Sequence, residues 1–408
     1  MTTGNAQPID RYFPLGPDFY QNPYVFYDRL RTEDPIHWSD LFGGWVLSRY
    51  ADVANCARDP RISARRMGGL MDLLPPDKRD SMREFEKVKS REMNMLDPPD
   101  HTRIRGLVNK AFSPRMVDGM RGRIQAIVDD LLNAVIARGH LDVIRELAFP
   151  LPATVIMEII GIPVEDRDLL KKWSDDQVKY TGSGRPTPEL ADAYRKSQFA
   201  IMDYYKGLIA IRKKAPRDDL LSSLIAAEES GEVLSEDELM SACVFLAVAG
   251  HETTTNLIGN GLLALVRHPD QHALLRENPS LAASTIEEML RYDAPVQRPA
   301  RIAAENFNWD GREVKKGQLL WQLLGSANRD PAAFDAPNTF DITRQNNRHV
   351  TFNVGIHFCL GAPLARLEGQ VAIETLVHRM PKLRLASDQA DWNPNMHFRG
   401  LRTLNVEF

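Results

Sequence analysis

Cys359 is the residue whose position most favours chemistry. It lies near the end of a loop, in residues 352–363 with the sequence FNVGIHFCLGAP, just before a helical pattern over residues 364–379. Free N–H groups and the positive end of the dipole at a helix start stabilise an anion, so a thiolate is favoured there, and metal coordination would lower the thiol pKa further. Cys56 and Cys243 stand far away in the sequence, and an odd number of cysteines argues against a disulfide framework.

The residues around Cys359 have the composition of a cradle for a flat ligand. Gly355 and Gly361 can adopt positive φ and let the backbone approach a ligand closely, and Phe352 can shield the sulfur from water. The ordinary alternative is a small buried cysteine with no chemical role. The spacing of these residues argues against that alternative.

A second group of polar residues interrupts an apolar helical pattern over residues 236–266. Gly250 costs about 1 kcal/mol relative to alanine in a helix interior, and Glu252 and Thr253 place a carboxylate and a hydroxyl in an apolar stretch. A solvated stripe, with the threonine bonded back to its own helix, is one explanation. His251 and Glu252 also match half of a zinc-protease motif, but Thr255 stands where that motif requires its second histidine.

The loop and the polar helix together resemble one known family. Phe352, Gly355, His357, Cys359 and Gly361 stand at the offsets of the heme-binding signature of the cytochrome P-450 family, and the similar order extends over nearly the whole chain. The resemblance implies a heme b (iron protoporphyrin IX) cofactor, with Cys359 as the axial ligand of the iron. Asn353 departs from the glycine that many members carry, but asparagine tolerates left-handed backbone better than most residues, so we expect the loop to keep its shape.

The resemblance also implies roles on both sides of the heme. Ala249 would open a groove for O₂, Thr253 would act at the oxygen, and Glu252 would relay protons from solvent. On the cysteine side, Glu288 and Arg291, spaced i and i+3, would join Arg344 in a network that holds the loop; exposed, such a pair would contribute only a few tenths of a kcal/mol. The family's propionate-binding positions are matched by His101, Arg105, Arg301 and His357.

The same resemblance predicts the substrate pocket. Its walls would come from residues 63–96 and from Phe245, Val248, Val296, Gln297, His397 and Phe398, most of them apolar, so the substrate should be apolar too. The methionines at 67, 71, 82, 93 and 95 are either a wall that repacks around the ligand or ordinary core residues. Arg65, Arg66, Arg298 and His397 lie near these segments and could bind a carboxylate or a polyol.

The elements that must position these residues are mainly helical. Apolar spacings of three and four predict helices through residues 115–290, with a break at Pro186 and Pro188, and strands are predicted at 45–47, at 301–314 with a turn at Asp310-Gly311, and at 401–408. Residues 63–96 and 328–347 read as long loops. We predict one domain over residues 1–408, mainly α with small β-sheets (α+β), of the triangular cytochrome P-450 type that encloses heme between a distal helix and the cysteine loop.

Composition limits the partners and the compartment. The 51 Lys and Arg against 55 Asp and Glu give a net charge of −4 without long runs of one sign, which disfavours nucleic acid as a partner. The first 14 residues have no apolar core of the kind found in signal peptides and membrane anchors. We therefore expect a soluble, cytoplasmic monomer.

The predicted function is that of a heme-thiolate monooxygenase. It would activate O₂ with two electrons from a separate ferredoxin and an NAD(P)H-dependent ferredoxin reductase, because no reductase module fits in 408 residues. Its substrate would be an apolar small molecule such as a terpenoid, steroid, polyketide or fatty acid, which it would hydroxylate or epoxidise. The alternatives are a peroxide-driven heme peroxygenase and, less favoured, a non-catalytic heme sensor or electron carrier; Glu252 and Thr253 favour the first function.

Overall fold

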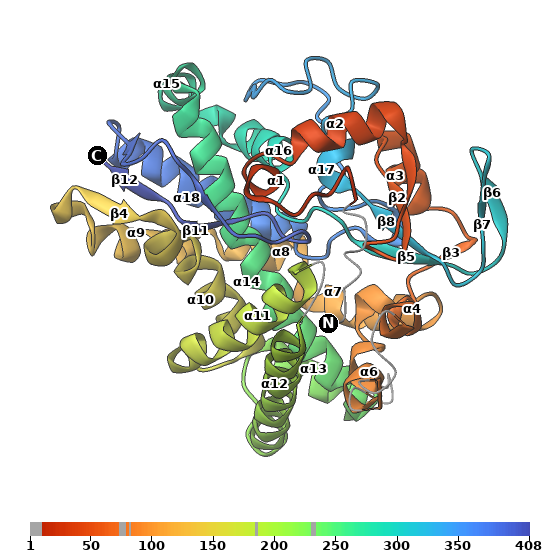
Figure 1. Cartoon of the computed structure of the whole chain (residues 1–408). Coiled ribbons are helices and arrows are strands. Elements are labelled where there is room, and N and C mark those ends of the chain that lie inside the picture. The colour runs from red at the N-terminus through yellow and green to blue at the C-terminus, as the bar shows by residue number, and fades with distance from the viewer. Residues whose placement is uncertain (1–9, 73–78, 81–82, 184–186, 230–233) are drawn as a thin grey trace, which may run out of the picture.

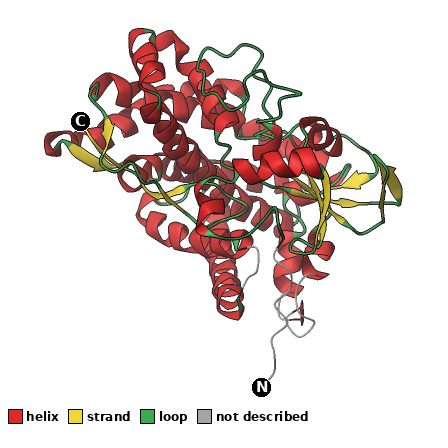
Figure 2. Ribbon diagram, turned by 45° about the horizontal axis from the view of Figure 1, so that its top comes forward, coloured by secondary structure: helices red, strands yellow, loops and turns green. Residues whose placement is uncertain are grey.

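Helices make up most of the molecule, and the strands gather in small sheets at its margins (Figure 1, Figure 2). The computed structural model describes residues 10–72, 79–80, 83–183, 187–229 and 234–408. The expected class, mainly α with small β-sheets, is confirmed by this architecture. Within the described ranges, none of the helices combines the length and the apolar character needed to cross a bilayer.

The longest helix, α14 (Glu236–Arg267), runs through the centre of the fold (Figure 1). It begins at a capping box, in which the Ser235 side chain accepts from the Glu238 N–H and the Glu238 carboxylate accepts from the Ser235 N–H. The sequence predicted this helix over 236–266, which is confirmed to within one residue. It packs against α10 (Pro150–Ile160), α16 (Ala282–Tyr292) and α18 (Ala362–Arg379).

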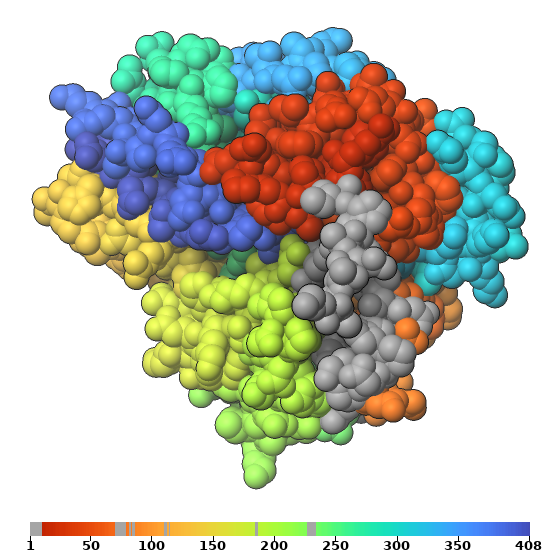
Figure 3. Space-filling model, in the orientation of Figure 1, coloured from red at the N-terminus to blue at the C-terminus, as the bar shows by residue number. Residues whose placement is uncertain are grey.

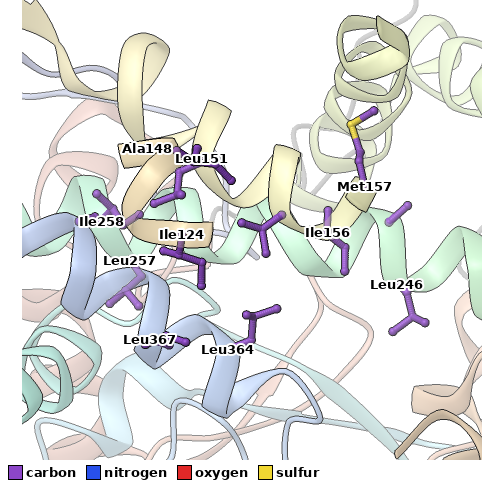
Figure 4. Packing of buried hydrophobic residues seen from close by; sticks show 14 of the residues in the cluster. Ile124, Ala148, Leu151, Ile156, Met157, Leu246, Leu257, Ile258, Leu364 and Leu367 are labelled. Atoms are coloured by element: carbon purple, nitrogen blue, oxygen red, sulfur yellow. The ribbon is translucent and has the colours of Figure 1, made fainter. Parts of the chain in front are cut away.

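One large apolar core holds these helices together (Figure 4). Leu246, Leu257 and Ile258 of α14 meet residues of α10 on one side and of α18 on the other. Gly250 belongs to the same packing, because a Cβ atom there would lie 2.6 Å from Cγ1 of Ile156 on α10. The glycine that costs helix stability therefore permits the close approach of α10.

An outer helical layer lies beside this core. It contains α11 (Arg167–Gly182) and α12 (Pro188–Lys214), which pack on each other, and α13 (Leu220–Glu229). The predicted break between two helices is found at Pro188, whereas Pro186 lies outside the described residues. Other helices are α1 (Pro17–Gln21), α2 (Tyr24–Glu33), α3 (Tyr50–Cys56), α7 (Asp100–Ala111), α8 (Pro114–Gly119), α9 (Arg121–Asn133), α15 (Pro269–Glu277) and α17 (Leu324–Ala327), with short helical turns at 93–95, 136–138, 144–148, 164–166, 279–281 and 355–357.

The prediction of a continuous loop over residues 63–96 is wrong. This segment contains α4 (Met67–Asp72), α6 (Arg83–Lys89) and a helical turn at Met93–Met95. These helices have seven residues or fewer, which is too short for an apolar period to stand out in the sequence. Met93 and Met95 are buried, whereas Met82 lies outside the described residues.

The largest sheet has five strands in the order β1-β2-β8-β5-β3 and forms one margin of the molecule (Figure 2). The predicted strands appear as β2 (Gly44–Leu47), β5 (Ala300–Ala303), and the hairpin of β6 (Phe307–Trp309) and β7 (Arg312–Val314). Asp310 and Gly311 turn this hairpin with φ of 49° and 82°. The sequence did not reveal β1 (Ile36–Ser39), β3 (Ile62–Ser63) or the fully buried β8 (Leu319–Gln322), which lacks the alternation of a half-exposed strand.

The C-terminal strands form a second margin. β12 (Asn405–Glu407) pairs with β4 (His140–Asp142) and β9 (Arg384–Leu385), and β11 (Leu401–Thr403) pairs with β10 (Asp391–Trp392). The space-filling view shows the N-terminal helices packed beside these C-terminal segments (Figure 3). This arrangement brings residues 396–399 next to the start of β5.

Candidate functional site

The loop that carries Cys359 is held by its own backbone. The Cys359 N–H donates to the Phe352 carbonyl at 2.9 Å, and Gly361 is the N-cap of α18. Asn353 adopts the left-handed conformation expected of it, with φ of 58°, and its side chain accepts from the Val354 N–H at 2.8 Å. Gly355 has φ of 75°, whereas Gly361 has an ordinary φ of −81°, so the loop uses the positive φ that glycine permits at Gly355 and not at Gly361.

Cys359 lies where opposing effects set its ionisation. It keeps some contact with solvent, yet the surrounding protein raises the pKa of its thiol. The N–H groups of Gly361 and Ala362 and the charges of Arg105 and Arg366 act in the opposite direction, because each stabilises the thiolate. The helix start and the two arginines thus prepare the sulfur to bind a cation such as iron.

The four predicted propionate ligands come together from three distant segments. His101 and Arg105 lie on α7, Arg301 on β5 and His357 on the turn before the cysteine. The rings of His101 and His357 are 4.3 Å apart between centroids. Arg105 donates to the carbonyls of Ile356 and Phe358 at 3.0 and 2.7 Å, which ties α7 to the cysteine loop.

Among the described residues, no carboxylate forms an ion pair with Arg105 or Arg301 of this cluster. Burial and the charges of Arg301, His101, Arg66 and Arg105 lower the pKa of His357 to about 2. Both ring nitrogens of His101 and Nε2 of His357 are buried without a hydrogen-bond partner in the described part of the chain. Unpartnered buried donors and uncompensated arginines fit the two propionate groups of a heme, which would supply acceptors and negative charge.

The three residues expected to brace the loop form one buried network. Glu288 and Arg291 are completely buried and pair through two hydrogen bonds of 2.8 Å. Arg344 reaches the same carboxylate at 3.1 Å, and the Asp341 N–H and Asn347 Nδ2 also donate to it. Because the network is buried, loss of one partner would leave an uncompensated buried charge, which is far more destabilising than loss of an exposed surface pair.

One face of α14 is left partly uncovered in the middle of an otherwise buried helix. Phe245, Ala249 and Thr253 recur at intervals of four residues and are all partly accessible, whereas Leu246, Ala247 and Val248 are buried. Positions four apart lie on the same side of a helix. This face therefore borders a space rather than a neighbouring element.

Glu252 and Thr253 have well-defined partners beside this face. The Thr253 hydroxyl donates to the Ala249 carbonyl at 3.1 Å, as in the simplest structural explanation, and its oxygen can still accept a hydrogen bond. Glu252 accepts from Asn256 at 3.2 Å, and burial together with the charge of Asp175 raises its pKa. A raised pKa brings a carboxyl closer to the range in which it can take up and pass on protons.

His251 is a core residue rather than a ligand. Its Nδ1 lies 2.8 Å from the Ala247 carbonyl and its Nε2 lies 3.0 Å from Ser174 Oγ. In the described part of the chain, no group of three or more His, Cys, Asp or Glu side chains could hold a metal ion. The zinc-protease interpretation therefore gains no support.

The predicted pocket residues near residues 296 and 397 lie side by side. Val296 and Phe398 form an antiparallel bridge, and the Gln297 N–H donates to the His397 carbonyl at 2.8 Å. The Gln297 side chain has other neighbours than that of Val296. Its side chain donates to the Ala294 carbonyl, lies against Gly325, and lines a small crevice next to Tyr20 and Tyr27. Successive side chains of an extended chain point to opposite sides, which directs Gln297 away from Val296.

Two charged groups prove to be buried: the sequence indicated Arg66 as a possible anchor, but it did not indicate Glu368. Arg66 is fully buried beside the cation cluster, and burial together with the charge of Arg301 lowers its pKa to about 9. Glu368 of α18 lies next to Thr254 of α14, both of its oxygens lack a partner among the described residues, and burial raises its pKa to about 8. The only sequence signal for Glu368 is a carboxylate on the apolar side of a helical pattern.

A loop that carries a thiol, opposite a helix with polar residues in its middle, is the arrangement that binds heme in heme-thiolate enzymes. The profile of the cytochrome P-450 family matches residues 186–400. The chain belongs to the cytochrome P-450 family, and it is accordingly an oxidoreductase that binds protoporphyrin IX heme. The resemblance inferred from the sequence is confirmed.

Relatives and solved structures support the assignment over nearly the full length. The chain is 40% identical to the biotin biosynthesis cytochrome P-450 of Bacillus subtilis (strain 168), over 96% of this chain and 97% of the relative. It is 42% identical to the vitamin D(3) 25-hydroxylase of Pseudonocardia autotrophica, over 95% and 94%. A solved P-450 in complex with a hexadec-9Z-enoic acid-ligated acyl carrier protein has a TM-score of 0.89 at 40% identity, over 96% of this chain and 99% of that one.

Proposed function

We propose that the protein is a monooxygenase that uses O₂ and two externally supplied electrons to hydroxylate or epoxidise an apolar molecule. The observation that carries the proposal is the position of Cys359 at the start of α18, together with the partly uncovered face of α14 at Ala249 and Thr253. Bound heme supplies the O₂-activating chemistry. Cys359 holds its iron, and His101, Arg105, Arg301 and His357 hold its propionates.

Glu252 and Thr253 move protons in this proposal. Burial and the charge of Asp175 raise the pKa of Glu252, which favours its protonated form, and Glu252 directly precedes Thr253 in the chain. Thr253 can receive a proton through its oxygen and pass its own hydrogen into the space that its face borders. A peroxygenase does not need such a relay, because peroxide already carries the reducing equivalents and both protons.

The electrons come from a separate protein that docks on the cysteine side. Ile356 and Phe358 are 51% and 39% exposed there, and Arg105 lies next to them. Arg58 and Arg348 are also exposed close to the loop. An acidic ferredoxin is complementary to such a surface, and the contact is expected to be small and sensitive to salt.

The substrate belongs to the broad group of apolar molecules that includes fatty acids, polyketides and steroids. Phe245, Val296 and Phe398, which are only partly buried, provide apolar surface for it. Two relatives are named for polyketide biosynthesis and for vitamin D(3) hydroxylation, and a solved P-450 with a TM-score of 0.88 holds myristic acid. These names support a range of elongated or polycyclic apolar substrates.

Two measurements test the proposal. The reduced, carbon monoxide-bound protein should show the red-shifted Soret band of a thiolate ligand, and the Cys359→His variant should lose it. Product formation should require ferredoxin, its reductase and NAD(P)H. Faster turnover with hydrogen peroxide than with the electron-transfer chain would favour the peroxygenase, and no turnover with either would favour a sensor or carrier.

A further inference from the structure

The pocket turn, residues 393–400, joins β10 to β11 and carries Phe398. Its C-terminal end is anchored in the core of the protein. The buried Arg399 forms an ion pair of 2.5 Å with Asp293, and Asn260 of α14 donates to the Arg399 carbonyl at 2.9 Å. This end of the turn is therefore fixed independently of the outer helices.

Asn395 organises the other end of the pocket turn. Its side-chain oxygen accepts from the N–H groups of His397 and Phe398, at 2.9 and 2.8 Å. An asparagine that bonds the backbone two residues further along the chain stabilises a turn. Phe398 also forms an antiparallel bridge with Val296. The oxygen of Asn395 therefore helps to fix the direction in which the Phe398 side chain leaves the turn.

The NH₂ group of the same amide fastens the pocket turn to the last turn of α11. It donates to the Val178 carbonyl at 2.8 Å, and the Met396 N–H donates to the Gly182 carbonyl at 2.9 Å. Carbonyls in the last turn of a helix lack partners within the helix, and Met396 supplies one for Gly182. A Cβ atom at Gly182 would overlap the Asn395 amide, so glycine permits this close contact.

This end of α11 has little other attachment to the core. Residues 175–181 are all partly or fully exposed, and the next buried residue is Gly182, at the contact with Asn395. Tyr180 stacks on Tyr194, which belongs to α12 in the same outer layer. A segment with few buried apolar contacts opens at a lower free energy than the core beside it. The hydrogen bonds to the pocket turn are therefore important for keeping this end of α11 in place.

We propose that Asn395 is a positioning residue of the substrate pocket: its oxygen holds Phe398 in the wall, and its NH₂ group closes the turn onto α11 between ligand entry and release. The bond to Val178 exists only while α11 lies against the turn, whereas the bonds to His397 and Phe398 lie within the turn and survive its separation from α11. The inference rests on the proposed function, which places Phe398 in the pocket wall.

Variants of Asn395 separate the two halves of the amide. Asn395→Asp keeps an oxygen acceptor for the turn but has no group to donate to Val178, and Asn395→Ala loses both. The probe is econazole, a bulky apolar azole that changes the Soret band of the ferric holoprotein when its nitrogen binds the iron. Imidazole is the matched probe, because it has no apolar group for the wall to hold.

The two halves predict different changes in econazole binding. Asn395→Asp should raise the association and dissociation rates together, by about two- to tenfold for one hydrogen bond, because the bond is lost from the free and the filled pocket alike. Its affinity should therefore stay within about twofold of the wild type. Asn395→Ala should in addition bind econazole roughly tenfold more weakly, whereas imidazole affinity should not change in either variant.

Gly182→Ala tests the same contact from the side of α11. Its Cβ atom would displace the Asn395 amide, so econazole exchange should become at least as fast as in Asn395→Asp. Thr181→Ala is the control, because this exposed neighbour donates to the Gln177 carbonyl of its own helix, and it should keep the wild-type rates. Heme content and Tm are measured for every variant, and Asn395→Asp should retain both.

Two results would overturn the proposal. Wild-type exchange rates in both Asn395→Asp and Gly182→Ala would show that the contact with α11 does not control ligand exchange. An unchanged econazole affinity in Asn395→Ala, or an equal loss for econazole and imidazole, would remove Asn395 from the positioning of the wall. Because the readout is ligand binding, the predicted pattern without ferredoxin-driven turnover would refute the proposed monooxygenase function alone.

Discussion

Glu368 should make the folded protein less stable as the pH rises, and the substitution Glu368→Gln should remove this pH dependence. The carboxyl lies between α18 and α14 at 1% exposure, without a hydrogen-bond partner for either oxygen in the described part of the chain. Burial raises its pKa from 4.5 to about 8. The Glu368→Gln variant keeps the shape of the side chain but has no group to ionise.

The direction of the change in stability with pH follows from which state, folded or unfolded, keeps the Glu368 proton. Between pH 4.5 and 8 the folded state keeps the Glu368 proton and the unfolded state releases it, so stability falls as pH rises through this window. One pKa unit corresponds to about 1.4 kcal/mol, which gives a loss of roughly 3 to 4 kcal/mol between pH 5 and pH 8 relative to the glutamine variant. For a chain of 408 residues, an unfolding entropy of about 0.9 kcal/mol per kelvin converts this loss to roughly 4 °C in Tm.

The assay is thermal unfolding of the heme-loaded proteins, followed by far-ultraviolet circular dichroism at pH 5, 6, 7 and 8. The quantity of interest is the Tm of Glu368→Gln minus that of the wild type, because histidines such as His357 and His397 titrate equally in both. This difference should grow steadily with pH. Glu374→Gln, an exposed position on the same helix, should show no trend. A Tm difference that stays constant from pH 5 to pH 8 would refute a buried, protonated Glu368.

Three further predictions concern the heme site. Thr253→Ala should uncouple NAD(P)H consumption from product and release hydrogen peroxide, whereas Thr253→Ser should stay coupled; unchanged coupling in the alanine variant would remove Thr253 from the relay. Glu288→Ala should leave Arg291 buried without its counter-charge, at a cost of about 3 to 5 kcal/mol, and the heme-to-protein ratio should fall sharply; normal heme content would contradict a bracing role. Asn353→Gly should change the Tm little because φ is 58° there, whereas Asn353→Val should destabilise by about 1 to 2 kcal/mol; equal Tm values for the two variants would contradict this backbone argument.

Features encoded by neighbouring residues were readable from the sequence. The capped apolar run of α14, the cysteine loop before α18 and the i and i+3 spacing of Glu288 and Arg291 are local patterns, and local hydrogen bonding and helix geometry determine them. The left-handed Asn353 and the turn at Asp310-Gly311 also follow from the intrinsic backbone preferences of these residues. Such features depend little on what the rest of the chain does.

The assembled site depended on contacts between distant segments. Arg344 could be assigned to the Glu288 network only by resemblance, because 56 residues separate it from that carboxylate. The opposite directions of Val296 and Gln297, and the helices within residues 63–96, likewise depend on what packs against them. The sequence therefore determined that a cysteine thiol stands at a helix start in a mainly helical fold. Only the tertiary structure decided that Arg66 and Glu368 are buried, because burial is a property of the packed whole rather than of a residue and its neighbours.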